Sequence, residues 1–282
     1  MYLRYIFLKQ LSSLLKKSVS VFIILLSLPA SAGDLYHLPV GAAEAGMGSV
    51  CIMKTGFWSS FQNQALLSYN RSYSAGINYE NRFNISELGT RTAGFVIPAG
   101  RASLGIVYSH FGYSCFRREM GGVACGLALG EKIAAGIQID YFSERTTGEY
   151  DNFQFVTCEA GLTVKPRENI MIGLHIVNPV PNSIRKRSLP ASLRAGAGIE
   201  LSKLLFAGAE AEMSSGKKLL LRTGFEYEAA KNFRLRGGFC TENTSFSFGL
   251  GYQVKFLKLD LSFASHEKLG FTSSCSLIIK IK

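Results

Sequence analysis

The chain has 282 residues, 47% of them hydrophobic, and a formal net charge of +11. This length fits one large domain, or at most two. The lysines and arginines are scattered along the chain, which argues against a nucleic-acid partner. One apolar run stands out, at the N-terminus, and the even spread of the rest excludes a bundle of membrane-spanning helices.

Residues 1–32 have the features of a secretory signal peptide. Four basic residues and no acidic one precede the apolar run from Val19 to Leu28, and Ala30-Ser31-Ala32 is a small-x-small cleavage site. The apolar run is about half as long as a membrane-spanning helix. We therefore expect cleavage after Ala32 rather than a retained anchor, which leaves the mature chain at 11 − 4 = +7.

From Asn70 to the C-terminus the hydrophobic pattern has a period of two. The clearest case sets Leu219, Leu221, Thr223, Phe225 and Tyr227 against Leu220, Arg222, Gly224, Glu226 and Glu228. One set is mostly apolar and aromatic, whereas the other is mostly charged or glycine. Side chains of a strand point alternately to opposite faces, so this pattern predicts strands with one apolar face.

The alternation divides residues 70–282 into about fourteen strand segments with no linker and no convincing helix. Most run ten residues or more, longer than the usual strand of a soluble sheet and long enough for a tilted strand to cross a bilayer. Their predicted starts lie near Asn70, Glu87, Arg101, Glu119, Lys132, Asp151, Asn169, Ser188, Leu204, Lys217, Asn232, Thr244, Leu257 and Gly270.

Connection lengths alternate as well. The connections at 99–101, 130–132 and 202–203 are short, whereas 112–118, 143–152 and 178–190 are longer. Short periplasmic turns with longer outer loops are typical of outer-membrane barrels with periplasmic termini. A soluble sandwich or propeller is the alternative. Glycine on the polar face would only weaken its strands, whereas inside a barrel glycine makes room for a plug or for neighbouring charges.

Charged residues on the inward face of the later strands are the candidate lumen charges. They are Arg194, Glu200, Glu210, Glu212, Arg222, Glu226, Arg234 and Arg236. Two roles remain open for them: they line a transport pathway, or they pair across strands and hold a plug in place.

No catalytic or metal-binding constellation is present in the sequence. The histidines His37, His110, His175 and His266 are isolated, and the six cysteines form no CxxC pair. Most cysteines fall in apolar strand patterns, where they behave as small hydrophobic residues. One disulfide in an oxidising compartment is the alternative that the sequence leaves undecided. We expect no enzyme activity, no cofactor and no metal.

Residues 33–69 do not alternate and carry a family signature. Gly41, Ala42, Ala45, Gly46, Met47 and Gly48, followed by Asn63, Ala65 and Leu67, fit the pattern G-A-x-x-A-G-M-G, spacer, N-P-A-x-L, with Gln64 in place of the proline. This resembles the FadL-like outer-membrane barrels, in particular the PorV/PorQ branch. Residues 173–181 (GLHIVNPVP) and the paired segments 221–227 and 235–238 extend the resemblance over most of the chain.

The resemblance implies a fourteen-stranded transmembrane antiparallel β-barrel over residues 70–282, in the bacterial outer membrane, with residues 33–69 as a plug in its lumen. It implies two functions. PorV/PorQ relatives serve type IX protein secretion or surface attachment, with secreted proteins or secretion-machinery components as partners besides outer-membrane lipid. FadL-type relatives transport small hydrophobic molecules such as fatty acids.

Overall fold

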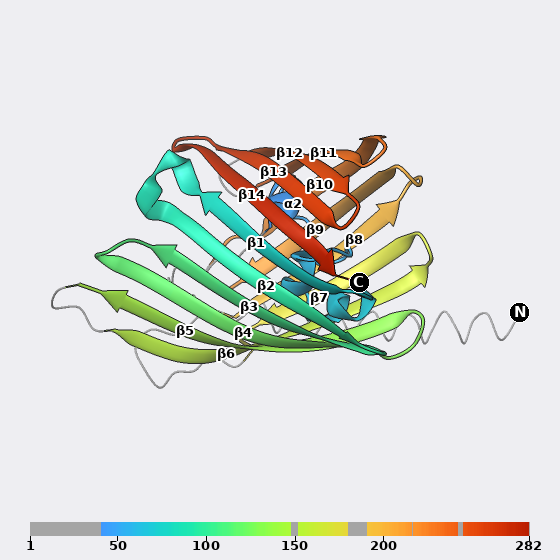
Figure 1. Cartoon of the computed structure of the whole chain (residues 1–282), viewed down its shortest axis with the longest axis horizontal. Coiled ribbons are helices and arrows are strands. Elements are labelled where there is room, and N and C mark those ends of the chain that lie inside the picture. The colour runs from blue at the N-terminus through green and yellow to red at the C-terminus, as the bar shows by residue number, and fades with distance from the viewer. Residues whose placement is uncertain (1–40, 148–151, 180–190, 216, 242–244, 282) are drawn as a thin grey trace, which may run out of the picture.

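The computed structural model describes residues 41–147, 152–179, 191–215, 217–241 and 245–281, which form a closed antiparallel barrel of fourteen strands (Figure 1). The predicted signal peptide and residues 33–40 of the predicted plug lie outside this range. The strands are β1 (Tyr73–Asn81), β2 (Gly89–Ala99), β3 (Ala102–Gly112), β4 (Phe116–Ala128), β5 (Ile133–Thr146), β6 (Phe153–Arg167), β7 (Ile170–Val177), β8 (Ser192–Glu200), β9 (Leu205–Ser214), β10 (Leu220–Ala230), β11 (Phe233–Cys240), β12 (Ser245–Val254), β13 (Leu257–His266) and β14 (Gly270–Ile281).

Closure comes from the pairing of the first strand with the last. The β1–β14 register runs from Tyr73 opposite Ile281 to Asn81 opposite Ser273, and every other strand pairs with its neighbours in sequence. A closed sheet has no edge strand with unpaired backbone groups, which is what a membrane requires of a β-structure. The predicted fold class is confirmed.

The strand starts agree with the predicted ones to within four residues. Two elements were not expected, the short helices η3 (Arg82–Asn84) and η4 (Ser86–Leu88) in the connection between β1 and β2. Each is a single turn of 3₁₀ helix, too short for a hydrophobic pattern to repeat, so it leaves no periodic signal in the sequence.

The outer face of the barrel is apolar, and the inner face consists mostly of polar residues and glycine. Ile137 and Leu221 are 61% and 47% exposed, whereas Gln138 and Arg222, which follow them in the chain, are 1% and 8% exposed. The predicted assignment of the two faces is therefore confirmed. None of the helices in the described residues is long and apolar enough to cross a membrane.

Connections at the two ends of the barrel differ in length, as the sequence predicts. Turns at the end that holds Tyr73 and Ile281 have two to four residues, whereas those at the opposite end have three to fourteen. We refer to these as the termini end and the loop end. On the pattern of outer-membrane barrels, the termini end is expected to face the periplasm.

Residues 41–69 of the N-terminal segment lie inside the barrel, where Figure 1 shows them in blue, enclosed by the strands. It contains α2 (Ala42–Ala45), η1 (Ser59–Phe61) and η2 (Gln64–Tyr69). Nearly all of its side chains are buried, including Trp58, Leu66 and Leu67. We call its described part, residues 41–69, the plug.

Candidate functional site: the plug and the lumen wall

The signature residues of the plug pack directly against the barrel wall. The backbone N–H of Ala42 donates to Ser276 Oγ at 2.8 Å, and that of Gly48 donates to Ser247 Oγ at 2.7 Å. Gly46 approaches the backbone of Gly249, and Met47 lies against β10 and β11. Gly41 precedes α2, and half-buried Ala45 ends it.

Asn63 organises the other end of the plug. Its side chain accepts from the N–H of Ala65 and so caps η2. Its Nδ2 donates to the carbonyl oxygen of Ile52 at 2.7 Å and to that of Leu162 in β6 at 3.4 Å. Opposite Asn63 the wall carries Gly161, where an added Cβ would lie 2.0 Å from Asn63 Oδ1. Glycine is needed here because the plug leaves no space for a side chain.

One group of lumen charges binds the plug through Arg194. Its Nη2 lies 2.5 Å from Glu210 Oε2, and its Nη1 donates to Gln62 Oε1 of the plug at 2.8 Å. Glu210 Oε1 in turn accepts from the plug N–H groups of Cys51 and Ile52. Both charged side chains are buried, so they form a strong connection between wall and plug.

The remaining lumen charges form further ion pairs. Glu212 pairs with Arg222 at 2.7 Å, and Glu226 pairs with Arg236 at 2.6 Å and with Lys54 of the plug at 2.8 Å. Arg236 also lies 2.8 Å from Asp260, and Arg234 lies 3.6 Å from Glu228. Glu200 is not part of these groups: it is exposed at the end of β8, near Lys165.

A buried polar group on β5, β6 and β7 was not predicted from the sequence. His175 Nε2 lies 3.0 Å from Glu159 Oε2, which also accepts from Nε2 of Gln64 in the plug at 2.7 Å. Gln138 donates to Asp140 at 2.8 Å beside them. The available signal was the alternation of Gln138 and Asp140 with the outward isoleucines of β5. His175 had no such signal, because β7 contains no Asp, Glu, Lys or Arg residue beside it.

The plug presents an aromatic face to the opposite side of the lumen. Phe57 packs edge-on to Trp58, with ring centroids 4.9 Å apart, and Phe61 lies 5.7 Å from Phe57. We call the buried group around these rings the aromatic cluster. Its wall members are Val96, Val107, Met120, Ala124, Phe142 and Ile278, with Phe155 stacked on Phe142. The wall members of the aromatic cluster thus lie on β14 and β2–β6, whereas the ion pairs that involve the predicted lumen charges lie on β8–β13.

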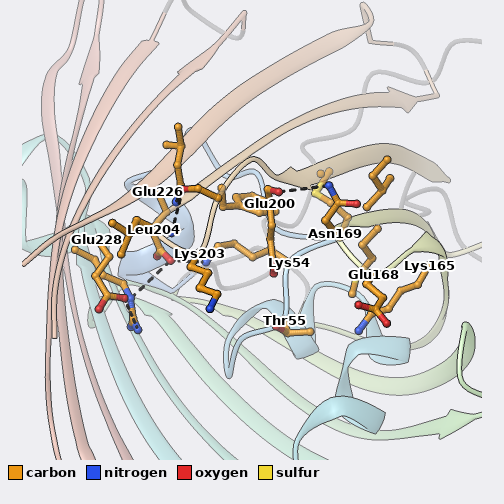
Figure 2. A pocket seen from close by; sticks show the side chains of 18 residues that line it. Lys54, Thr55, Lys165, Glu168, Asn169, Glu200, Lys203, Leu204, Glu226 and Glu228 are labelled. Carbon is orange, nitrogen blue, oxygen red and sulfur yellow. Dashed lines mark hydrogen bonds and ion pairs between the residues drawn. The ribbon is translucent and has the colours of Figure 1, made fainter. Parts of the chain in front are cut away.

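At the termini end the plug and the turns enclose a polar pocket with a volume of about 240 Å³. Figure 2 shows side chains of both signs around it, among them Lys54, Lys203, Glu168 and Glu226. The mixture of charges and the exposure of Glu168 and Lys203 indicate a hydrated mouth rather than an apolar binding site.

Burial also sets the chemistry of the plug cysteine. Cys51 is fully buried, and this raises the pKa of its thiol to about 12. All six cysteines lie in the described residues, and no two of them form a disulfide. Within the same described residues, no group of three His, Cys, Asp or Glu side chains is placed to hold a metal ion.

Comparisons with known proteins support the fold. No family model matches the sequence. No curated protein matches it either. Among solved structures, the CymD monoaromatic hydrocarbon channel is 13% identical, with a TM-score of 0.69, over 88% of this chain and 99% of that one.

Two further solved structures agree with this likeness. The Ralstonia pickettii toluene transporter TbuX is 12% identical, with a TM-score of 0.61, over 88% of this chain and 98% of that one. A Pseudomonas aeruginosa FadL homologue is 12% identical, with a TM-score of 0.60, over 86% and 97%. This chain therefore has the fold of these channel and transporter structures, a closed fourteen-stranded barrel with an N-terminal segment inside it.

Proposed function

We propose that this protein is a bacterial outer-membrane channel for small hydrophobic molecules. The observation that carries the proposal is the aromatic cluster, a buried apolar and aromatic group between the plug and the wall at β14 and β2–β6. Apolar and aromatic side chains with a few placed polar groups are what sites for small apolar ligands consist of. The fold likeness to structures described as a monoaromatic hydrocarbon channel and a toluene transporter supports the same function.

In this proposal the lumen charges and the aromatic cluster have separate roles. Arg194, Glu210 and Glu226 of the wall fix the plug, the last through Lys54. The aromatic cluster offers an entering molecule contacts that replace water, because the rings of Phe57 and Phe61 are held in place by the plug. Export after cleavage near Ala32, insertion into the outer membrane and the absence of enzyme activity belong to the same proposal.

The test uses the single tryptophan of the sequence, because Trp58 lies inside the aromatic cluster. Toluene titrated into the purified barrel should change the emission of Trp58 with saturation. The Phe57→Ala variant should weaken this response about tenfold, since it removes a ring in contact with Trp58. Phe248→Ala, which removes a lipid-facing ring, is the matched control and should leave the response unchanged.

Uptake completes the test. Cells that express this protein should take up radiolabelled toluene faster than cells that express the Phe57→Ala variant. Equal uptake, together with unsaturable Trp58 emission, would contradict the channel function.

A second function, in protein secretion or surface attachment, follows from the PorV/PorQ resemblance of the sequence. One structural observation favours it: the plug is tied to several strands of the wall by the Lys54–Glu226 ion pair and by buried hydrogen bonds to Arg194, Glu210 and Glu159, which suits a sealed barrel. Cross-linking in native membranes distinguishes the two functions. Recovery of defined exported proteins with the barrel, while toluene leaves Trp58 emission unchanged, would favour this second function over transport.

A further inference from the structure

The lipid-facing wall at β1, β2 and β3 contains an apolar groove with a volume of about 400 Å³. It is lined by small outward residues such as Ala75 and Ala93, and by larger ones such as Ile77, Ile106 and Tyr108. The groove exists because alanine stands where most outward positions carry a larger side chain. Within a bilayer, an apolar groove of this kind is filled by hydrocarbon.

Exposed tyrosines mark the position of the groove relative to the membrane surface. Tyr79, Tyr108 and Tyr141 are 41%, 47% and 47% exposed. They lie toward the loop end of this wall: Tyr108 and Tyr141 are both opposite Gly121 of β4, and Tyr79 is one outward position nearer the loop end in the register. Rows of tyrosine mark the interface between hydrocarbon and water in membrane barrels. Outward side chains at the level of these tyrosines, or nearer the loop end, therefore lie among the lipid headgroups.

Three arginines occupy this headgroup level. Arg91 is the outward residue of β2 that precedes Ala93, on the side of the loop end, and it is directly opposite Tyr79. Arg117 of β4 and Arg145 of β5 lie directly opposite each other, nearer the loop end. All three are exposed, and the part of the chain that the structure describes offers none of them an ion pair within 4 Å.

Three exposed guanidinium groups at this level favour the binding of an anionic ligand. Like charges directly opposite each other on neighbouring strands destabilise a sheet. Glu119 lies on the same face, and the Tyr108 hydroxyl donates to it at 3.2 Å, but one carboxylate leaves the three guanidinium groups with a net charge of about +2. Arginine binds phosphate through two parallel hydrogen bonds, and lipid phosphates lie at this level of the membrane.

We propose that this wall binds a phosphate-bearing lipid of the surrounding bilayer, with an acyl chain in the groove and phosphate groups on Arg91, Arg117 and Arg145. Arg91 and Ala93 are two residues apart on one strand, a rise of about 7 Å, so one lipid molecule spans both. The lipid site lies outside the lumen and does not depend on transport.

The test measures lipid retained by the full-length barrel. The protein is reconstituted in phosphatidylcholine vesicles that contain diphosphoryl lipid A or its dephosphorylated form, extracted in detergent and analysed by native mass spectrometry. We expect about tenfold better retention of the diphosphoryl form. Arg91→Gln, Arg117→Gln and Arg145→Gln combined should abolish this preference. Arg101→Gln with Arg167→Gln, which changes exposed arginines at the termini end, should preserve it.

A second pair of variants tests the groove. Ala93→Leu fills it and should lower retention with all arginines intact, whereas Ala135→Leu, on the lipid-facing side of β5 outside the groove, should not. Equal retention of the two lipid forms would overturn the proposal, as would an unchanged result with Ala93→Leu. Complete displacement of lipid A by millimolar inorganic phosphate would also overturn it, because it would reduce the site to a phosphate contact.

Discussion

Arg194 of β8 lies 2.5 Å from Glu210 of β9, and each of them also binds the plug, Arg194 through Gln62 and Glu210 through the backbone of Cys51 and Ile52. The pair thus connects two wall strands to a segment about 150 residues away in sequence. Removing one partner of a buried ion pair leaves the other charge uncompensated, which costs more than the pair contributes.

We therefore expect Arg194→Met to destabilise the plug by about 3–5 kcal/mol, since Glu210 then stays buried without its cation. Limited proteolysis of the reconstituted barrel measures this as faster cleavage within residues 41–69. The double variant Arg194→Met, Glu210→Met should recover part of the loss because it leaves no unpaired charge. Equal cleavage of wild type and Arg194→Met would show that this pair does not hold the plug.

The close contact between the plug and the wall leads to a second prediction. Gly161→Ala places a Cβ 2.0 Å from Asn63 Oδ1, so the plug has to shift, at a cost of about 1–3 kcal/mol. Gly121→Ala is the matched control, because no atom lies within 4 Å of its added Cβ. Thermal melting followed by circular dichroism should show a lower Tm for the first variant only. Identical Tm values for the two variants would mean that Asn63 of the plug does not contact Gly161 of β6.

Chemical labelling of Cys51 tests whether the plug is buried inside the barrel. Only the thiolate reacts with maleimides, and a pKa of about 12 leaves about one thiol in ten thousand ionised at pH 8, against about one in ten for an ordinary thiol. In the native barrel we expect Cys51 to stay unlabelled at pH 8 while the exposed Cys115 reacts. After denaturation both should react. Rapid native labelling of Cys51, detected by peptide mass spectrometry, would contradict its burial.

Strand positions were predictable because period-two alternation is a local property. The starts of β13 and β14 at Leu257 and Gly270 fall where the sequence predicts them. The largest difference is at β8, expected near Ser188 and found at Ser192, after a proline-containing connection without alternation. The face that a side chain occupies is equally local: Arg222 and Glu226 lie on the inward face, where they form ion pairs.

Partners of the lumen charges were not predictable, because they depend on how the plug lies against strands far away in sequence. Nothing local indicates that Glu226 contacts Lys54, or that Glu159 joins Gln64 to His175. The replacement of the signature proline by Gln64 is informative only in the structure. There the amide of Gln64 becomes the plug's connection to the buried Glu159.

The same connections predict how the lumen opens. Lys54→Met removes the plug's ion pair with Glu226, which is partly exposed and worth on the order of 1 kcal/mol, whereas Glu210→Gln weakens the buried connection to Cys51 and Ile52. Combined, the two changes should raise ion conductance through the barrel in planar bilayers, because the plug then samples positions away from the charged wall. Lys203→Met is the matched control, since Lys203 lies on the same pocket without an ion pair among the described residues. Conductance of the combined variant equal to that of Lys203→Met would mean that the aromatic cluster alone keeps the lumen closed.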